Sequence, residues 1–255
     1  MMEFLRVRQD AEALFPRAAE HLAELEGHLG NYESRVRFSF RPQNPSHPEL
    51  SIRDKVLLVL LSITASARLT TWTIVDSLNR DMTPGMYLAT RAHLELTAVV
   101  AYTLVNLRRY QKGDLSGPAF EILLDRLNLG RRHGVEDTIA RSPHLEGHIE
   151  MIGVMTLLDA VDRVVDMPEL KGRFRDSYEW LSEFCHPNIL SRMALGHELA
   201  NGVVTFARIP VMTEDNVVNA LGPGNISHNI FFFCYDTIAH LIGGVPPGAI
   251  EEKQA

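Results

Sequence analysis

The sequence is poor in cysteine. Only two of its 255 residues, Cys185 and Cys234, are cysteines, too few for a disulfide framework in a chain of this length. Each follows a phenylalanine in an apolar stretch, which predicts buried free thiols. This usage is typical of a reducing compartment, and we expect a cytoplasmic protein.

Positive charge is also scarce. Lysine and arginine number 25 against 32 aspartates and glutamates, for a formal net charge of -7. Because non-specific nucleic-acid binding needs a basic surface, the overall charge argues against it. Arg108-Arg109 and Arg131-Arg132-His133 are candidates for a local basic patch, although a solvated helix face is the simpler interpretation.

Long apolar runs are missing as well. The most apolar segment, residues 56–67, is bounded by Lys55 and Arg68 and is shorter than the roughly 20 residues that a membrane span needs. We interpret it as a core helix. Residues 1–8 lack the apolar centre of a signal peptide, so we expect no membrane partner.

The common motifs of metal and phosphate chemistry are absent or incomplete. The sequence has no glycine-rich phosphate loop, no Gly-x-Ser-x-Gly and no Cys-x-x-Cys. Glu183-x-x-His186 is half of a di-iron signature without a convincing second copy. His144 and His148 have helical ligand spacing but no obvious third ligand. We therefore predict neither a metal nor a cofactor.

What the sequence does contain is helical periodicity. Apolar spacing predicts a mainly α-helical bundle with one β-hairpin insertion near residues 195–209. Asn201-Gly202, between two strand-like runs, predicts the hairpin turn. The predicted helices cover residues 3–29, 51–79, 83–110, 120–139, 149–165, 168–186, 214–220 and 225–242. We expect an N-terminal helix and loop over 1–48, a bundle core over 49–245 and a flexible tail over 246–255.

The strongest candidate site lies on the helix before Pro187. Tyr178, Ser182 and His186 are spaced by four, which predicts a polar line on one helical face, and Asn188 follows just beyond. A histidine titrates near neutral pH and can transfer protons. The alternative is a buried Tyr–Ser–His hydrogen-bond network that anchors the hairpin without catalysis.

A second pair lies on another apolar helix. Arg91 and Glu95 are four residues apart and form either an exposed intrahelical ion pair of small energetic value or an interior pair with a functional role. We expect this pair to meet the polar line and Asn188 in one interhelical pocket. A spacing of arginine and histidine found in helical ribonucleases also occurs at Arg192 and His197, but His197 is predicted to begin the hairpin.

These residues carry a resemblance. Arg-x-x-x-Glu at Arg91, followed by Tyr-x-x-Leu-Ser-x-x-x-His-Pro from Tyr178 and a hairpin, resembles a bacterial family of helical domains of unknown function near the HEPN superfamily. The likeness covers roughly residues 50–210. It implies a helical bundle, commonly a homodimer, with an RNA-directed or defence-related role.

The resemblance also implies roles for single residues. If the protein cleaves RNA, His186 is the general acid or base and Arg91 stabilises phosphate charge, with Glu95 in the same site. The usual Arg-x4–6-His spacing is not found at His186, since Arg175 lies eleven residues before it. Two alternatives stay open: a non-catalytic binding or assembly module, a homodimer whose polar pocket is structural, and a small-molecule enzyme with a deep cleft beside His186.

Overall fold

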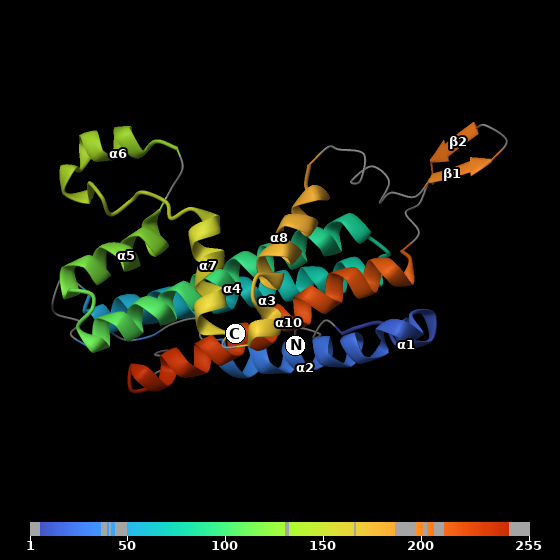
Figure 1. Ribbon diagram of the computed structural model, residues 1–255, viewed down its shortest axis with the longest axis horizontal. Helices are drawn as coiled ribbons and strands as arrows, with labels where there is room; N and C mark the ends of the chain where they lie inside the picture. The colour runs from blue at the N-terminus through green and yellow to red at the C-terminus, as the bar shows by residue number, and fades with distance from the viewer. Residues whose placement is uncertain are drawn as a thin grey trace, which may run out of the picture. The chain divides into compact units, whose positions relative to one another are not determined.

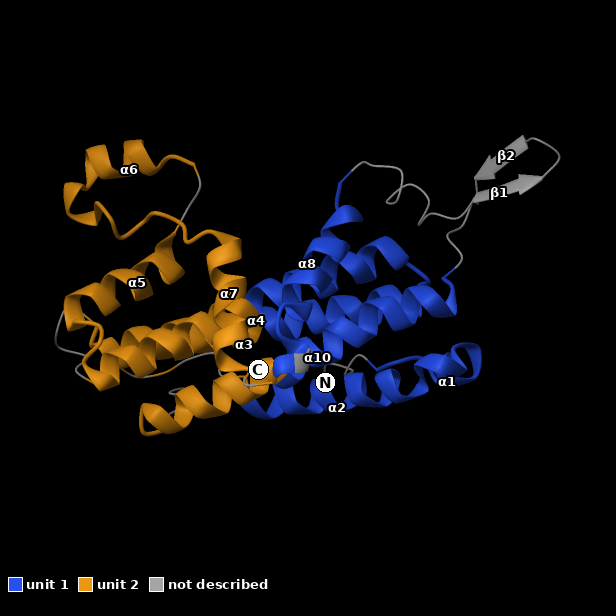
Figure 2. Ribbon diagram, in the orientation of Figure 1, with its two compact units in different colours: residues 1–35, 66–96, 168–229 blue, residues 36–65, 97–167, 230–255 orange. Residues whose placement is uncertain are grey.

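The chain divides into two compact units, each assembled from separate stretches of sequence. Unit 1 comprises residues 1–35, 66–96 and 168–229, and unit 2 comprises residues 36–65, 97–167 and 230–255 (Figure 2). The predicted boundaries at residues 48 and 245 do not coincide with this division, because residues 1–35 belong to the same unit as residues 66–96. The computed structural model describes residues 6–36, 40, 42–43, 50–130, 133–165, 167–186, 197–200, 203–206 and 212–244.

The described elements are mainly α-helices (Figure 1), which confirms the predicted class. The long helices are α2 (Ala19–Arg35), α3 (Ile52–Asn79), α4 (Thr83–Lys112) and α10 (Glu214–Leu241). The shorter ones are α1 (Ala11–Leu14), α5 (Gly117–Leu129), α6 (Val135–Arg141), α7 (Val154–Val164) and α8 (Arg173–Glu183). Three single 3-10 turns each begin at a proline: η1 (Pro16–Ala18), η2 (Pro143–Leu145) and η3 (Pro168–Leu170).

Two short strands lie between α8 and α10 in the sequence. β1 (His197–Ala200) and β2 (Val203–Phe206) pair antiparallel, with His197 opposite Phe206. The Asn201-Gly202 turn predicted between them lies outside the described residues, and so does Arg192.

Serine side chains start two helices of unit 2. Ser51 Oγ accepts a hydrogen bond from the Asp54 N–H at 3.1 Å and donates to Asp54 Oδ2 at 2.8 Å. This confirms the start of α3 that a serine followed three residues later by an acid predicts. Ser116 Oγ accepts from the Ala119 N–H at 3.4 Å at the start of α5.

Glycine and proline break the helices at other places than predicted. α2 continues through Gly30-Asn31 to Arg35. The helix predicted over residues 120–139 is instead two helices, α5 and α6, because Gly134 takes a left-handed φ of 69° between them. α8 likewise begins only after Gly172, whose φ is 78°.

The predicted break near residue 220 is wrong, because α10 runs unbroken with Pro223 inside it. A proline within a helix costs roughly 3 kcal/mol or more. Burial offsets that cost here, since Ala220, Leu221 and Asn225 on either side of the proline are all buried in unit 1.

The core of unit 1 is formed by α2, α8, the second part of α3 and the first parts of α4 and α10. Its most deeply buried apolar side chains include Leu22, Leu25, Ile74, Leu78, Met86, Leu94, Leu181 and Val217. Arg68 joins α3 to α2, because its guanidinium donates to both carboxylate oxygens of Glu33 at 2.6 and 3.1 Å and lies 3.9 Å from the centroid of the Trp72 ring.

The core of unit 2 is formed by α5, α7, the first part of α3 and the later parts of α4 and α10. Its buried side chains include Val56, Leu57, Leu60, Val100, Leu104, Phe120, Leu124, Leu158, Val161, Phe231 and Ile238. Cys234 is fully buried among them, as predicted, and burial raises the pKa of its thiol to about 12.

α3 is long and apolar enough to cross a membrane by length and composition alone. Its most apolar window has a mean hydropathy of 1.5, and 44% of that window is buried. Core helices of soluble proteins have the same length and composition, so the cytoplasmic location stays a prediction.

Candidate functional site

Four of the predicted site residues meet where α8 packs on α4 in unit 1. Arg91 Nε donates to Ser182 Oγ at 2.9 Å. Arg91 Nη2 donates to the Tyr178 hydroxyl and pairs with Glu95 Oε1 at 2.9 Å. The Tyr178 hydroxyl in turn donates to Glu95 Oε1 at 3.0 Å. We call Arg91, Glu95, Tyr178 and Ser182 the arginine quartet.

The quartet is partly shielded from water. The Arg91 side chain is 28% exposed and that of Glu95 is 38% exposed, whereas Tyr178 is buried. Burial alone would lower the pKa of Arg91, but the Glu95 carboxylate and the Tyr178 oxygen outweigh it and raise that pKa. Burial and the Glu95 carboxylate raise the pKa of Tyr178. Arg91 therefore stays cationic and Tyr178 neutral at physiological pH.

Cys185 is a neighbour of the quartet that the sequence interpretation did not include. Its thiol donates to the Leu181 carbonyl at 3.5 Å and interacts with Arg91. Burial raises the pKa of the Cys185 thiol, although Arg91 opposes the shift. The group is therefore a neutral thiol near neutral pH, and the thiolate that nucleophilic chemistry requires is disfavoured.

His186 does not continue the polar line of Tyr178 and Ser182. α8 ends at Glu183. A turn follows, in which the Cys185 N–H donates to the Ser182 carbonyl. His186 lies beyond this turn with an exposed side chain. The predicted helical line is therefore wrong at its last member. Within the part of the chain that the structure describes, no hydrogen bond or ion pair joins His186 to the quartet.

Asn188, the other residue predicted to line this pocket, lies outside the described residues. The structure thus places two of the three residues assigned to catalysis, Arg91 and Glu95, in one cluster with two of the three assigned to binding, Tyr178 and Ser182.

The hydrogen bonds of the quartet are directed mainly at its own members. Tyr178 uses its hydroxyl both as donor and as acceptor, and Ser182 Oγ donates to the Tyr178 carbonyl at 2.7 Å while it accepts from Arg91. One positive and one negative charge cancel. Such a cluster fixes the orientation of α8 on α4. The raised pKa values of Arg91 and Tyr178 keep both groups protonated near pH 7.

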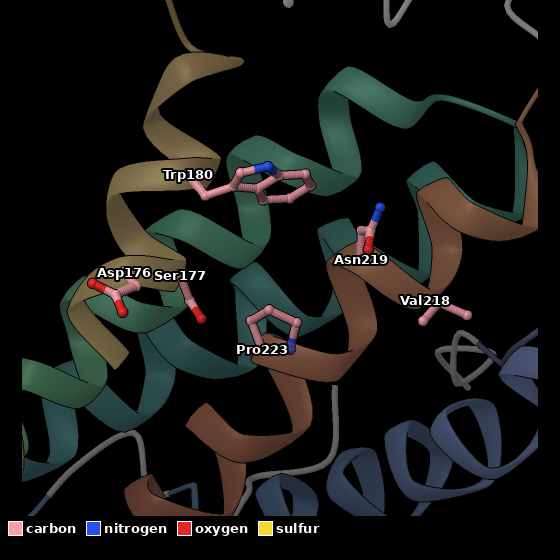
Figure 3. Close-up of a pocket in the computed structure, with 6 residues that line it drawn as sticks. All are labelled: Asp176, Ser177, Trp180, Val218, Asn219 and Pro223. Atoms are coloured by element: carbon pink, nitrogen blue, oxygen red, sulfur yellow. The ribbon is translucent and has the colours of Figure 1, made fainter. Parts of the chain in front are cut away.

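A pocket of about 310 Å³ opens on another side of α8, where α10 faces it (Figure 3). α8 contributes Asp176, Ser177 and Trp180, and α10 contributes Val218, Asn219 and Pro223. All six belong to unit 1.

Aromatic contacts hold the Trp180 ring in place. Tyr87 of α4 and Phe184 each meet it edge to face or nearly so, at centroid distances of 5.5 and 4.8 Å. Asn216 of α10 donates to the Tyr87 hydroxyl at 3.1 Å. The wall of the pocket is thus linked to both α4 and α10.

Three histidines that the sequence interpretation missed are stacked in the core of unit 1. His28 of α2, His93 of α4 and His228 of α10 are all buried. The His228 ring lies between the other two, with centroid distances of 4.6 Å to His28 and 3.9 Å to His93. We call these residues the histidine stack.

Hydrogen bonds set the protonation of the stack. His228 Nδ1 lies 2.6 Å from the Gly224 carbonyl, and because a carbonyl only accepts, this nitrogen carries the hydrogen. Nε2 of the neutral ring is then an acceptor and lies 2.9 Å from the Thr71 hydroxyl, which also lies 2.8 Å from the Ala67 carbonyl. His93 bonds to the Tyr32 hydroxyl through Nε2 and to Ser227 Oγ, at 2.8 Å, through Nδ1.

Burial keeps the stack uncharged. It lowers the pKa of His28 from 6.5 to about 4 and that of His93 to about 3. The pKa of His228 is lowered by burial and further by the two neighbouring rings. The one available sequence signal was the position of His93 inside Arg91-x-x-x-Glu95, on a strongly apolar helix, and a lone histidine there is ordinarily a core residue.

Unit 2 contains a separate ionic cluster. Lys55 Nζ lies 3.1 Å from Asp125 Oδ1 and 3.6 Å from Glu121 Oε2, and His148 Nδ1 lies 2.8 Å from Asp125 Oδ2. His148 is therefore engaged with a carboxylate. Over the described part of the chain, no group of three or more His, Cys, Asp or Glu side chains is arranged to hold a metal ion.

Comparison with known proteins adds no relative: no family model, curated protein or solved structure matches this chain. The resemblance to helical domains near the HEPN superfamily therefore stays a prediction.

Proposed function

We propose that this protein is a non-catalytic binding module. In this proposal the arginine quartet holds α8 on α4, and α8 together with α10 presents a pocket to a ligand. The observation that carries the proposal is the inward direction of the quartet's hydrogen bonds, in which Arg91 contacts Glu95, Tyr178 and Ser182 at once. A guanidinium whose donors already bind three protein side chains is better suited to holding two helices together than to binding a reacting substrate.

The protonation states support the same proposal. A general acid or base works best with a pKa near the operating pH, but the pKa values of Arg91, Tyr178 and Cys185 are all raised away from neutrality. His186, the residue to which the resemblance assigns proton transfer, is exposed beyond the end of α8.

An RNA substrate is the less favoured alternative. The chain carries a formal net charge of -7. Of the described residues that line the α8–α10 pocket, Asp176 alone is charged. Phosphate recognition would require cationic groups there. The homodimer predicted from the sequence stays a prediction.

The test compares Tyr178→Phe with Tyr110→Phe. Tyr178→Phe removes a hydroxyl that donates to Glu95 and accepts from Arg91, so we expect a loss of about 1–3 kcal/mol in the free energy of unfolding. Tyr110 stacks on Phe120 and makes no hydroxyl hydrogen bond with the described residues, so its replacement should change stability by less than about 0.5 kcal/mol. Urea unfolding followed by circular dichroism gives both values.

The same proteins are incubated with a labelled single-stranded RNA. Wild type should leave the RNA intact. Cleavage that disappears in His186→Ala, while the melting temperature of that variant stays at the wild-type value, would overturn the proposal in favour of the ribonuclease.

A further inference from the structure

We infer that the α8–α10 pocket binds an organic cation, a primary ammonium or guanidinium group on a short aliphatic chain. The inference rests on the proposed binding function and names the chemical class of its ligand. It follows from the charge, the aromatic face, the acceptors and the size of the pocket.

Among the described residues that line the pocket, the only charged one is an aspartate. Asp176 is exposed, and its carboxylate forms no ion pair or hydrogen bond with the described residues. Glu179, on the same helix, instead pairs with Arg175 at 3.1 Å. None of the lining residues is cationic. Figure 3 shows the Asp176 carboxylate at the edge of the pocket, directed away from Trp180 and Asn219. A ligand with a positive charge therefore gains an opposite charge at this edge, and an anionic ligand meets repulsion.

The Trp180 ring can make a cation–π contact with a positively charged ligand. Its side chain is 38% exposed although Tyr87 and Phe184 pack against it. Figure 3 shows the indole above the space between α8 and α10, on the opposite side from Pro223. The indole is the best aromatic partner for a cation.

Pro223 removes one helical hydrogen bond from the opposite wall. Because proline has no N–H, it cannot donate to the carbonyl of Asn219 one turn earlier in α10. This carbonyl therefore lacks its helical partner, and both residues belong to the wall of the pocket. The Asn219 amide oxygen and the Ser177 hydroxyl are further acceptors. An ammonium or guanidinium group consists only of donors and matches this set.

The size of the pocket limits the ligand. A volume of about 310 Å³ lies at the lower end of the roughly 300–1,000 Å³ that is usual for small-molecule sites. Val218 and the Pro223 ring supply apolar surface. A cationic head with an aliphatic chain of about four carbons can enter a space of this size. Such a group is present in a free amine and in a lysine or arginine side chain.

The experiment is a titration of the full ¹⁵N-labelled chain with n-butylammonium and n-butylguanidinium. The Trp180 indole N–H signal should move in a saturable way, while that of Trp72, packed under Arg68, stays in place. Butyrate and n-butanol, which have similar chains without the positive charge, should produce no saturable shift. Spermidine and a lysine-containing peptide in further titrations distinguish a free amine from a protein side chain as the natural source.

The matched variants are Asp176→Asn and Glu179→Gln. Both remove one negative charge from α8, but only Asp176 lines the pocket. We expect Asp176→Asn to raise the Kd for butylammonium about threefold or more, and Glu179→Gln to leave it within the error of measurement. A second variant, Trp180→Leu, should weaken binding while α8 remains folded, as judged from its amide signals.

Equal effects of the two charge variants, or saturable binding of butyrate or butanol in preference to the cations, would overturn the inference and leave a binding module with another ligand. If no probe moves the Trp180 signal, the inference is wrong. Failure of the proposed function is recognised separately, by RNA cleavage that depends on His186.

Discussion

At the scale of single residues, burial decides which groups of unit 1 carry charge. The histidine stack is uncharged because solvation of an imidazolium is lost in the core, with pKa values of about 4 for His28 and about 3 for His93. In the unfolded chain these rings titrate near 6.5. Protons therefore bind the unfolded state preferentially between these values, so stability falls as the pH drops below about 6.5.

The stack thus predicts acid sensitivity. His28 and His93 should each cost about 2 kcal/mol of unfolding free energy between pH 7 and pH 5, because one pH unit is worth about 1.4 kcal/mol per proton. Urea unfolding at several pH values measures this slope. His93→Gln should reduce it relative to wild type, whereas His240→Gln, which replaces an exposed histidine of α10, should leave it unchanged. A stability that is flat from pH 7 to pH 5 would contradict the uncharged stack.

The sequence located the arginine quartet because its polar residues are spaced by four on apolar helices, and that spacing survives folding. His186 has the same spacing in the sequence, but it does not join the quartet because the helix ends at Glu183. The histidine stack could not be predicted from the sequence, for a different reason. His28, His93 and His228 come from three helices, and nothing local to any of them encodes their contact.

At the scale of elements, α10 shows packing overriding a local signal. The pair Pro223-Gly224 predicts an interruption, yet the helix is continuous and its flanking residues are buried. The consequence is an Asn219 carbonyl without its helical N–H partner beside the pocket.

Pro223→Ala should therefore separate stability from binding. Alanine restores an N–H to the helix, so the free energy of unfolding should rise by about 1–3 kcal/mol, while the Asn219 carbonyl becomes engaged and the Kd for butylammonium rises. Pro118→Ala is the control, because Pro118 lies in the first turn of α5, where proline is well tolerated. Thermal unfolding and the indole titration give the two readings. Unchanged affinity in Pro223→Ala would remove this carbonyl from the site.

At the scale of the whole molecule, the division into two units was not predictable from local pattern. Its boundaries at residues 65, 96 and 229 fall inside α3, α4 and α10. Helical periodicity continues through each boundary, and it does not indicate which segments of the chain pack together. The predicted bundle over residues 49–245 therefore captured the helical class and not the division.

The most direct test of whether the arginine quartet positions the pocket is the Kd of n-butylammonium for the full-length Tyr178→Phe variant, compared with wild type and Tyr110→Phe. Tyr178 does not line the pocket, but it ties α8 to Arg91 and Glu95 of α4. If the quartet positions the pocket, the folded Tyr178→Phe protein binds the cation more weakly than wild type and Tyr110→Phe does not. Equal affinity in all three proteins would show that the quartet and the pocket are unconnected.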